Sequence, residues 1–447
     1  MKKLHFLVLL ICLSSTGFSQ FKGFPKDNTG NLSGGMGLNW IDGKLFYSIY
    51  FNPELSFSNF GVGLDLKFDV DSKGNLRKEN FNEFSDYLSI IRYVRYGLKK
   101  DPVFVKLGAL DYYTLGHGSI MYLYNNSPTY DVRKIGLVLD IDFGPFGFES
   151  IYSKFAEAGV AGFRGYIRPL QLTSAADIPI IGNLEVGLTY AGDFNQNAGI
   201  VSGTYDNVQR KINPIKDEGS INIIGFDLGL PIIQGSMANL TLYMDYANIL
   251  GFGGGTAAGA IFNFNPLGLV SGSVKLERRF NGDKYFPSYF NSLYEVERFK
   301  VDTASGTFIS KAQMLSAATN IGNGFYGELG INVLGLFNIL GSYQRLDKQP
   351  TSGILHIGTE LAPESFPFLA RVGYDKINII DEKDLFKLDD RSYLFFELGY
   401  KPYPYLIVSM LYNWTFAPVR DKDDKVIDFK PQKRIEPRVY FVYPFNF

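Results

Sequence analysis

Residues 435–447 read IEPRVYFVYPFNF, and this stretch gives the strongest indication of the fold. Every second residue toward its end is apolar or aromatic: Val439, Phe441, Tyr443, Phe445 and Phe447. A β-strand points alternate side chains to opposite faces, so these residues share one face of a strand. Soluble sheets alternate in the same way, and the rest of the chain has to decide between a soluble sheet and a membrane barrel.

Residues 1–19 have the pattern of an export signal. The start is basic, residues 4–13 are apolar, and Gly17 and Ser19 are the small residues that a signal peptidase inspects. We expect cleavage after Ser19. The apolar stretch is about ten residues long, which is too short for a helix that crosses a bilayer.

Charge and cysteine content exclude several classes of protein. Cys12 is the only cysteine and lies in the export signal, so we expect a mature chain without disulfides, thiol nucleophiles or cysteine metal ligands. A formal net charge of −1 argues against binding of nucleic acid. No run of 18 apolar residues follows the signal, which argues against a helical membrane protein.

The composition favours a membrane barrel over a soluble fold. Aromatic residues make up 16% of the chain, and it contains 48 glycines. Aromatic side chains form girdles at both interfaces of a transmembrane barrel, and glycines allow strands to bend. A secreted β-sandwich or propeller is the alternative, in which the aromatic residues would form a soluble core.

Alternation recurs in segments of about ten residues, the length that a tilted strand needs to cross a membrane. Residues 60–68, 135–143, 184–190 and 240–246 each show one apolar face and one face with charged or small residues. We expect about twenty strands, at 33–42, 44–57, 60–70, 87–98, 103–111, 134–143, 147–155, 160–170, 184–194, 220–229, 239–249, 257–264, 269–280, 323–333, 336–346, 353–361, 368–379, 392–400, 405–416 and 435–447.

The connections between these strands differ in length in a regular way. Long connectors are expected after odd-numbered strands, at 71–86, 112–133, 195–219, 281–322, 380–391 and 417–434. Tight turns are expected after even-numbered strands, at 99–102, 144–145, 265–268, 334–335 and 401–404. Long loops at one rim and short turns at the other indicate an up-and-down barrel with both termini on the periplasmic side.

These features together resemble the porin-like outer-membrane β-barrels of Gram-negative bacteria. The resemblance implies an all-β fold, a closed antiparallel transmembrane barrel of about 18 to 20 strands in the outer membrane. Residues 20–32 would form a short periplasmic segment and residues 33–447 the barrel. It also implies contact with outer-membrane lipid, and recognition of Tyr443, Phe445 and Phe447 by the barrel-assembly machinery.

Patterns of catalytic residues are absent from the sequence. No serine has glycine two residues before and two residues after it, so the nucleophile-elbow pattern is missing. The histidines of the mature chain, His117 and His356, are too far apart for a local zinc motif. We therefore expect no enzymatic activity, no cofactor and no metal site.

Alternation places a set of charged side chains in the barrel lumen. The pore-lining candidates on the strands are Lys106, Asp140, Asp142, Arg164, Arg168, Lys275, Glu277, Arg279, Arg371, Glu436 and Arg438. Opposed clusters of charge across a pore would create a transverse field that orients polar solutes. Alternatively, these side chains pair with neighbours on adjacent strands. One strand, 87–98, is not assigned, because a simple alternation would place Arg92 in the lipid unless a bulge intervenes.

The connector 112–133 differs from the other long connectors because it is rich in apolar residues and tyrosines. It follows the fifth strand, and in general porins the third outward loop folds into the lumen as a constriction. By this resemblance Asp111, His117, Asp131 and Arg133 are candidate constriction residues. The alternatives are a packed outer loop or two additional short strands.

The leading interpretation of function is passive diffusion of small hydrophilic solutes. Two other functions remain open, a transporter of hydrophobic compounds resembling the fatty-acid channel family and a surface structural or adhesive barrel that uses loops 195–219 and 281–322. A barrel enzyme acting on lipid is disfavoured. The sequence leaves the identity of the solute and the oligomeric state undetermined.

Overall fold

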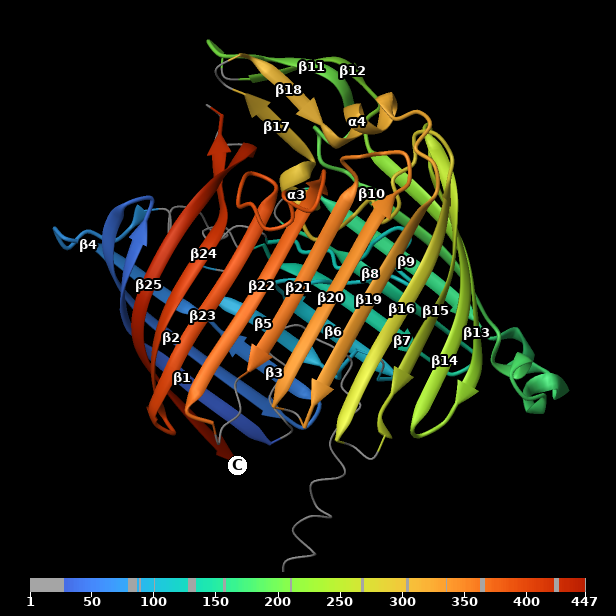
Figure 1. The fold of residues 1–447 in the computed structure, drawn as a ribbon, viewed down its shortest axis with the longest axis horizontal. Coiled ribbons are helices and arrows are strands. Elements are labelled where there is room, and N and C mark those ends of the chain that lie inside the picture. The colour runs from blue at the N-terminus through green and yellow to red at the C-terminus, as the bar shows by residue number, and fades with distance from the viewer. Residues whose placement is uncertain are drawn as a thin grey trace, which may run out of the picture.

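The computed structural model describes residues 28–78, 87, 90–99, 101–127, 134–155, 158–209, 211–266, 269–302, 305–334, 336–361, 366–421 and 426–446. Within these residues the chain forms one large sheet that closes on itself as a barrel, with a small second sheet above one rim (Figure 1). The predicted export signal and the assembly residue Phe447 lie outside the described residues.

The barrel strands run up and down around the wall in chain order. Their bounds are β1 Thr29–Ile41, β2 Lys44–Phe57, β3 Phe60–Leu64, β4 Leu66–Asp71, β5 Ile91–Tyr96, β6 Val103–Gly108, β7 Gly136–Asp142, β8 Phe146–Tyr152, β9 Val160–Ile167, β10 Glu185–Asp193, β13 Ile221–Gln234, β14 Ala238–Ile249, β15 Gly253–Phe264, β16 Val270–Asn281, β19 Gly324–Val333, β20 Phe337–Leu346, β21 Gly353–Leu361, β22 Phe368–Ile379, β23 Ser392–Tyr403, β24 Leu406–Arg420 and β25 Val426–Asn446. Adjacent strands pair antiparallel throughout.

The barrel is closed by pairing of its first and last strands. β1 pairs with β25 from Thr29↔Asn446 to Ile41↔Arg434. β3 and β4 both pair with β2 and together form one strand that is interrupted at Asp65. Counted this way the barrel has 20 strands, and the predicted fold class is confirmed. β1 begins at Thr29, so residues 29–32, expected in the periplasmic segment, belong to the first strand.

The two faces of the wall differ as the alternation predicts. On β14, Leu242, Met244 and Tyr246 are each more than 40% exposed, whereas Tyr243 and Asp245 between them are buried. At the C-terminus, Val439, Phe441 and Tyr443 are likewise exposed. The exposed apolar belt faces lipid and the buried polar side chains face the lumen, which is the arrangement of an outer-membrane barrel.

A β-bulge resolves the unassigned strand. The register between β3 and β5 shifts between Gly63 and Leu64, so that Gly63 faces Tyr93 and Leu64 faces Ile91. The extra residue, Arg92, therefore turns inward together with Tyr93, and its guanidinium lies 2.6 Å from Glu54. The bulge avoids placing the charge of Arg92 in lipid.

Two long connectors are not simple polar loops, which corrects the expectation for 195–219 and 281–322. They contribute β11 Ile200–Asp206, β12 Lys211–Asp217, β17 Phe299–Asp302 and β18 Thr307–Ser310 to a four-stranded sheet above the barrel (Figure 1). The helices α3 Tyr294–Glu297 and α4 Lys311–Ala317 lie in the second connector. The sheet packs on an apolar cluster that includes its own Ile200, Phe299 and Phe308 and also Ile427 of β25.

The rule of long connectors at one rim has an exception. Residues 168–184 connect β9 to β10 at the periplasmic rim and contain the 3₁₀-helices η2 Pro169–Leu172, η3 Ser174–Asp177 and η4 Ile181–Asn183. The connector expected at 417–434 is also largely strand, because β24 and β25 continue above the barrel as a hairpin. None of the helices within the described part of the chain is long and apolar enough to cross a membrane.

Candidate constriction in the barrel lumen

Residues 112–127, called the inner loop, leave β6 and return toward β7. The ends of the inner loop meet, because Tyr113 and Tyr124 each donate a backbone hydrogen bond of 2.8 Å to the other's carbonyl. Asn126 fixes the return: its side chain accepts from the Leu110 amide at 3.0 Å and donates to the Ser153 carbonyl at 2.8 Å. The inner loop is therefore a closed excursion from two fixed points on the wall.

The inner loop reaches the far side of the barrel. The Tyr112 hydroxyl donates to Asp375 on β22 at 3.1 Å, and the Tyr112 ring lies 5.1 Å from the ring of His356 on β21. Between β6 and β22, on the shorter way round, stand β5, β3/β4, β2, β1, β25, β24 and β23. The inner loop thus crosses the lumen instead of packing above the rim.

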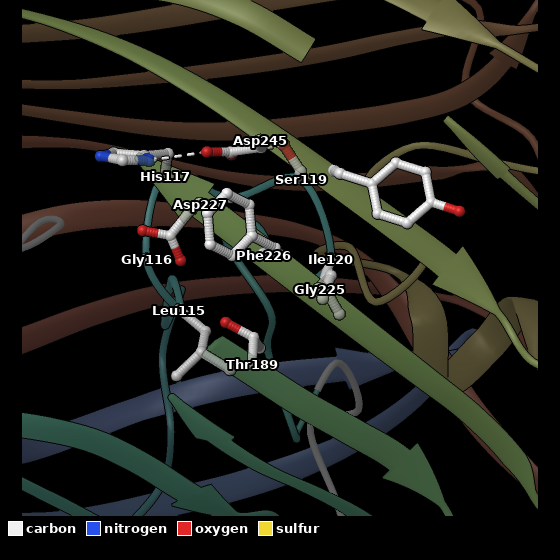
Figure 2. Close-up of a pocket in the computed structure, with 12 residues that line it drawn as sticks. Leu115, Gly116, His117, Ser119, Ile120, Thr189, Gly225, Phe226, Asp227 and Asp245 are labelled. Atoms are coloured by element: carbon white, nitrogen blue, oxygen red, sulfur yellow. Dashed lines mark hydrogen bonds and ion pairs between the residues drawn. The ribbon is translucent and has the colours of Figure 1, made fainter. Parts of the chain in front are cut away.

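The middle of the inner loop binds to β14 through a buried carboxylate. His117 Nδ1 lies 2.8 Å from Asp245 Oδ1, and the Ser119 hydroxyl donates to Asp245 Oδ2 at 2.6 Å. Figure 2 shows His117 and Asp245 pointing toward one another. The imidazole also stacks on the Tyr243 ring with centroids 4.3 Å apart. A small hollow remains beside this contact, lined by residues that include Thr189 and Asp227.

Lys275 on β16 contacts the inner loop from the barrel wall. Its ammonium donates to the His117 carbonyl and lies 4.8 Å from the Tyr122 ring and 5.0 Å from the Tyr326 ring. A cation over the faces of aromatic rings is attracted by their electron density, more strongly where water is excluded. Lys275 thus holds the loop by a charged hydrogen bond and by its cation–π contact with Tyr122.

The apolar residues of the inner loop pack against one side of the barrel. Leu115, Ile120 and Met121 are buried in a cluster that includes inward-facing residues of the wall strands from β6 to β14. Ile120 sits directly over Gly225 on β13, where a Cβ atom would lie 2.7 Å from Ile120 Cδ1. Burial of these side chains removes apolar surface from water, which favours the inward position of the loop.

A second chain segment enters the lumen. Residues 285–299, called the α3 segment, pair with the inner loop through backbone hydrogen bonds: Phe290 N donates to Ile120 O at 3.1 Å, Tyr122 N to Phe290 O at 3.0 Å, and Ser288 N to Ser119 O at 2.8 Å. Pairing of this kind holds two strands in register. The inner loop and the α3 segment therefore form one unit.

The α3 segment also spans the lumen. The Tyr294 hydroxyl donates to Asp193 on β10 at 2.7 Å, and Arg298 Nε lies 2.6 Å from the same carboxylate. On the other side the Ser292 hydroxyl donates to Asp375 on β22 at 2.7 Å. The carboxylate of Asp375 therefore accepts hydrogen bonds from both segments that cross the lumen, from Tyr112 of the inner loop and from Ser292 of the α3 segment.

Glu295 in the α3 segment is a buried carboxylate with several charged and polar partners. Its carboxylate accepts from the Tyr124 hydroxyl at 2.5 Å and pairs with Lys134 and Arg298. Burial alone would raise the pKa of Glu295, but the charges of Arg298 and Lys134 outweigh it and lower this pKa to about 2. Burial, with the negative charge of Glu295, raises the pKa of the Tyr124 hydroxyl well above its ordinary value.

The strand charges form local pairs. The pairs among them are Arg164 with Asp227 at 2.6 Å, Lys67 with Glu436 at 3.0 Å, Arg438 with Glu397 at 2.5 Å, Arg371 with Glu360 at 2.8 Å, Lys275 with Glu277 at 3.7 Å, and Arg279 with Glu277. Opposite charges thus neutralise each other on the same strand or across at most two intervening strands of the wall. Two opposed walls of charge, which a transverse field would need, are not formed by these residues.

Several candidate residues lie away from the expected position. Arg168 pairs with Asp142 at 2.9 Å and donates to the Gly144 carbonyl, which places both charges at the periplasmic turn. Asp111, a constriction candidate, lies 3.8 Å from Lys106, a pore-lining candidate on β6. Asp140 accepts a hydrogen bond of 2.8 Å from the Tyr113 hydroxyl beneath the inner loop. Asp131 and Arg133 fall outside the described residues.

Sequence reasoning missed the α3 segment and the wall residues that receive it. The signal was present, because residues 285–299 include Tyr285, Phe286, Tyr289, Phe290 and Tyr294, which are too apolar for a solvated loop. Asp193 and Asp375 were missed because each lies at the upper end of a strand.

The comparisons with known proteins concern the fold. No protein-family model and no curated protein matches the chain. Among solved structures, a triple mutant of the Rhodopseudomonas blastica porin matches with 11% identity and a TM-score of 0.25, covering 93% of this chain and 99% of the porin. Wzi of Escherichia coli, described as a carbohydrate-binding β-barrel involved in capsule assembly, matches with 11% identity and a TM-score of 0.34, covering 94% and 85%. The assignment as a porin-like outer-membrane barrel rests on the closed sheet and its apolar belt.

The inner loop and the α3 segment, together called the crossing unit, carry groups that can bind a polar solute. The crossing unit presents hydroxyls, an imidazole and paired charges to the lumen, and these groups can replace part of the hydration shell of a polar solute. Among the described residues, no group of three or more histidine, cysteine, aspartate or glutamate side chains is placed to hold a metal ion.

Proposed function

We propose that this protein is an outer-membrane channel for small hydrophilic solutes, with a lumen narrowed by the inner loop and the α3 segment. The observation that carries the proposal is the crossing of the lumen by the inner loop, which binds Asp245 on β14 and reaches Asp375 on β22. A barrel of this size is too wide for strand side chains to fill, so the crossing unit sets its free width.

The size of the spaces beside the inner loop supports a restriction to small solutes. Two small hollows flank it, and the second is lined by polar side chains such as Asn291, Gln344 and His356. Each hollow offers about 20 Å³ to the centre of a water molecule, and one water needs about 10 to 15 Å³ of such space, so each hollow has room for one or two waters. A larger solute would have to displace the crossing unit.

The test shortens the inner loop and keeps the backbone pair at its base. Replacing residues 114–123 by Asn-Gly keeps the backbone pair of Tyr113 and Tyr124 and closes it with a two-residue turn. We expect single-channel conductance in planar bilayers to increase, by about twofold or more, because the lumen is wider. The barrel should still migrate as a heat-modifiable band, since its strands satisfy their own hydrogen bonds.

The matched control shortens a hairpin outside the lumen. Asp206 and Lys211 form the last pair of β11 and β12, so residues 207–210 can be replaced by the same Asn-Gly turn. Its conductance should equal that of the unmodified protein. Equal conductance of the inner-loop variant and this control would contradict the proposal.

A surface structural or adhesive role is the second candidate, favoured by the four-stranded sheet and its apolar cluster above the barrel. The bilayer experiment separates the two candidates. A folded protein that conducts neither before nor after shortening of the inner loop would favour the surface role. A transporter of hydrophobic compounds is disfavoured, since the apolar residues in the lumen pack against each other.

We also propose that the chain is exported by residues 1–19 and cleaved after Ser19, and that Tyr443, Phe445 and Phe447 are read during barrel assembly. The intact mass of protein purified from outer membranes should correspond to residues 20–447. A mass that includes residues 1–19 would contradict the cleavage.

A further inference from the structure

The periplasmic connector 168–184 has an unusual composition for a turn at the rim of a barrel. Its aliphatic side chains are exposed: Leu172 by 59%, Ile178 by 45%, Ile180 by 42% and Ile181 by 46%. Between Arg168 and Glu185 the only charged residue is Asp177. Solvated turns seldom expose this many large apolar residues together, and exposed apolar patches mark interaction surfaces.

The position of the connector indicates what the patch contacts. In Figure 1 the connector projects sideways from the lower part of the barrel wall, beside β13. The patch continues the lipid-facing belt, because Ile167 on β9 and Ile233 on β13 are also exposed. The Asn183 side chain donates to Gln234 at 3.4 Å and ties η4 to the end of β13.

The backbone of the connector is suited to an apolar surrounding. Its amides donate within the connector: Thr173 to Leu170, Ile178 to Ala175, Gly182 to Ile178 and Leu184 to Ile181, at 2.9 to 3.1 Å. A segment in contact with hydrocarbon has to satisfy its backbone polar groups internally, since no water is present to do so. Three consecutive 3₁₀-helices achieve this in a short span.

Ile180 gives an independent observation. Its φ of +71° and ψ of −69° place it at the centre of a γ-turn, closed by a 2.8 Å hydrogen bond from the Ile181 amide to the Pro179 carbonyl. This backbone conformation is strained for a β-branched residue and would be relaxed by glycine. A strained isoleucine with an exposed side chain indicates that the side chain itself is needed on the surface.

We propose that the connector 168–184 is an interfacial anchor that inserts Leu172, Ile178, Ile180 and Ile181 into the periplasmic leaflet of the outer membrane. The partner is phospholipid at the boundary between headgroups and acyl chains, as for an amphipathic segment that lies in the membrane plane. The patch is continuous with the lipid-facing belt at Ile167 and Ile233, which favours lipid over a protein partner.

The test uses tryptophan as a probe of the surroundings. The chain contains two tryptophans, and replacing them as W40F and W414F gives a background for single probes at Leu172→Trp and Ile181→Trp. Folded variants, selected by heat-modifiable migration, are reconstituted into phosphatidylcholine vesicles. Fluorescence is then quenched either by brominated acyl chains or by acrylamide in the water.

Two reference probes calibrate the measurement. Leu188→Trp on β10 reports the lipid-facing wall, since Leu188 is 66% exposed there, and Val208→Trp reports water, since Val208 is 93% exposed on the outer hairpin. We expect both connector probes to be quenched by brominated lipid, more by bromine near the glycerol end of the chain than near the methyl end. Quenching by acrylamide alone would overturn the proposal, and so would protection from both quenchers, which would indicate burial against the barrel itself or against a second copy of the chain.

Discussion

Lys275 shows how one side chain positions the inner loop. It lies on β16, within the wall, and contacts the loop at the His117 carbonyl and the Tyr122 ring. Its charge is balanced by Glu277 at 3.7 Å, which in turn pairs with Arg279. If the ammonium is removed, Glu277 still pairs with Arg279, but the inner loop loses its charged contact.

The substitution Lys275→Met tests this role with little change in volume. We expect the inner loop to be destabilised by about 1 to 3 kcal/mol, the range for a charged hydrogen bond with added cation–π contacts. Single-channel recordings should then show more frequent steps to higher conductance. The thermal midpoint of the barrel should change little.

Arg278→Met on the same strand is the control for Lys275→Met. Arg278 pairs with Asp347 at 2.6 Å in an exposed position, and exposed ion pairs contribute about 0 to 1 kcal/mol. Its recordings should match those of the unmodified protein. If the recordings of Lys275→Met show no more steps to higher conductance than those of Arg278→Met, Lys275 does not hold the loop.

At the scale of elements, the α3 segment depends on ionised Glu295. The folded-state pKa of Glu295 is lowered from 4.5 to about 2. A carboxyl group with a lowered pKa contributes stability above its unfolded value, and this contribution is lost as the pH falls through the folded value. The α3 segment should therefore stay in place from neutral pH to about pH 5 and be released between about pH 4.5 and 2.

Conductance as a function of pH measures this release. We expect constant conductance down to about pH 5 and larger conductance states at lower pH. Glu295→Gln leaves Lys134 without its carboxylate partner and Arg298 with Asp193, and loss of one partner of a buried pair costs about 3 to 5 kcal/mol. The variant should show the large states already at neutral pH. A variant with the unmodified pH profile would exclude Glu295 as the group responsible.

The four-stranded sheet above the barrel, called the outer sheet, is continuous in the chain with the crossing unit. α3 ends at Glu297, and β17 of the outer sheet begins at Phe299. Lys311 at the start of α4 pairs with Glu297, so the outer connector is also tied to the α3 segment by charge. A shift of the outer sheet would therefore be transmitted to the α3 segment through one residue of backbone and one ion pair.

At the scale of the whole molecule, the barrel and the crossing unit are held by different forces. The wall is held by backbone pairing that closes between β1 and β25. The crossing unit is held by side-chain contacts to the wall, through Asp193, Asp245 and Asp375. Because these contacts are independent of the strand ladder, the crossing unit can move while the barrel stays intact.

The sequence by itself determined the class of the protein. Alternation with a period of two depends only on the strand geometry, so segments such as 240–246 and 435–447 predicted the faces that the barrel turns to lipid and to the lumen. The unusual apolar content of 112–133 likewise marked the inner loop. Both signals are local, and local signals are readable from a single chain.

Only the tertiary structure decided which distant residues meet. Tyr112 and Asp375 are brought together because barrel closure places β22 across from β6, and no local pattern encodes that distance. The α3 segment lies in the lumen for the same reason, since its partners Asp193 and Asp375 come from opposite walls. The bulge at Arg92 depends on the register between β3 and β5, which pairing of whole strands fixes.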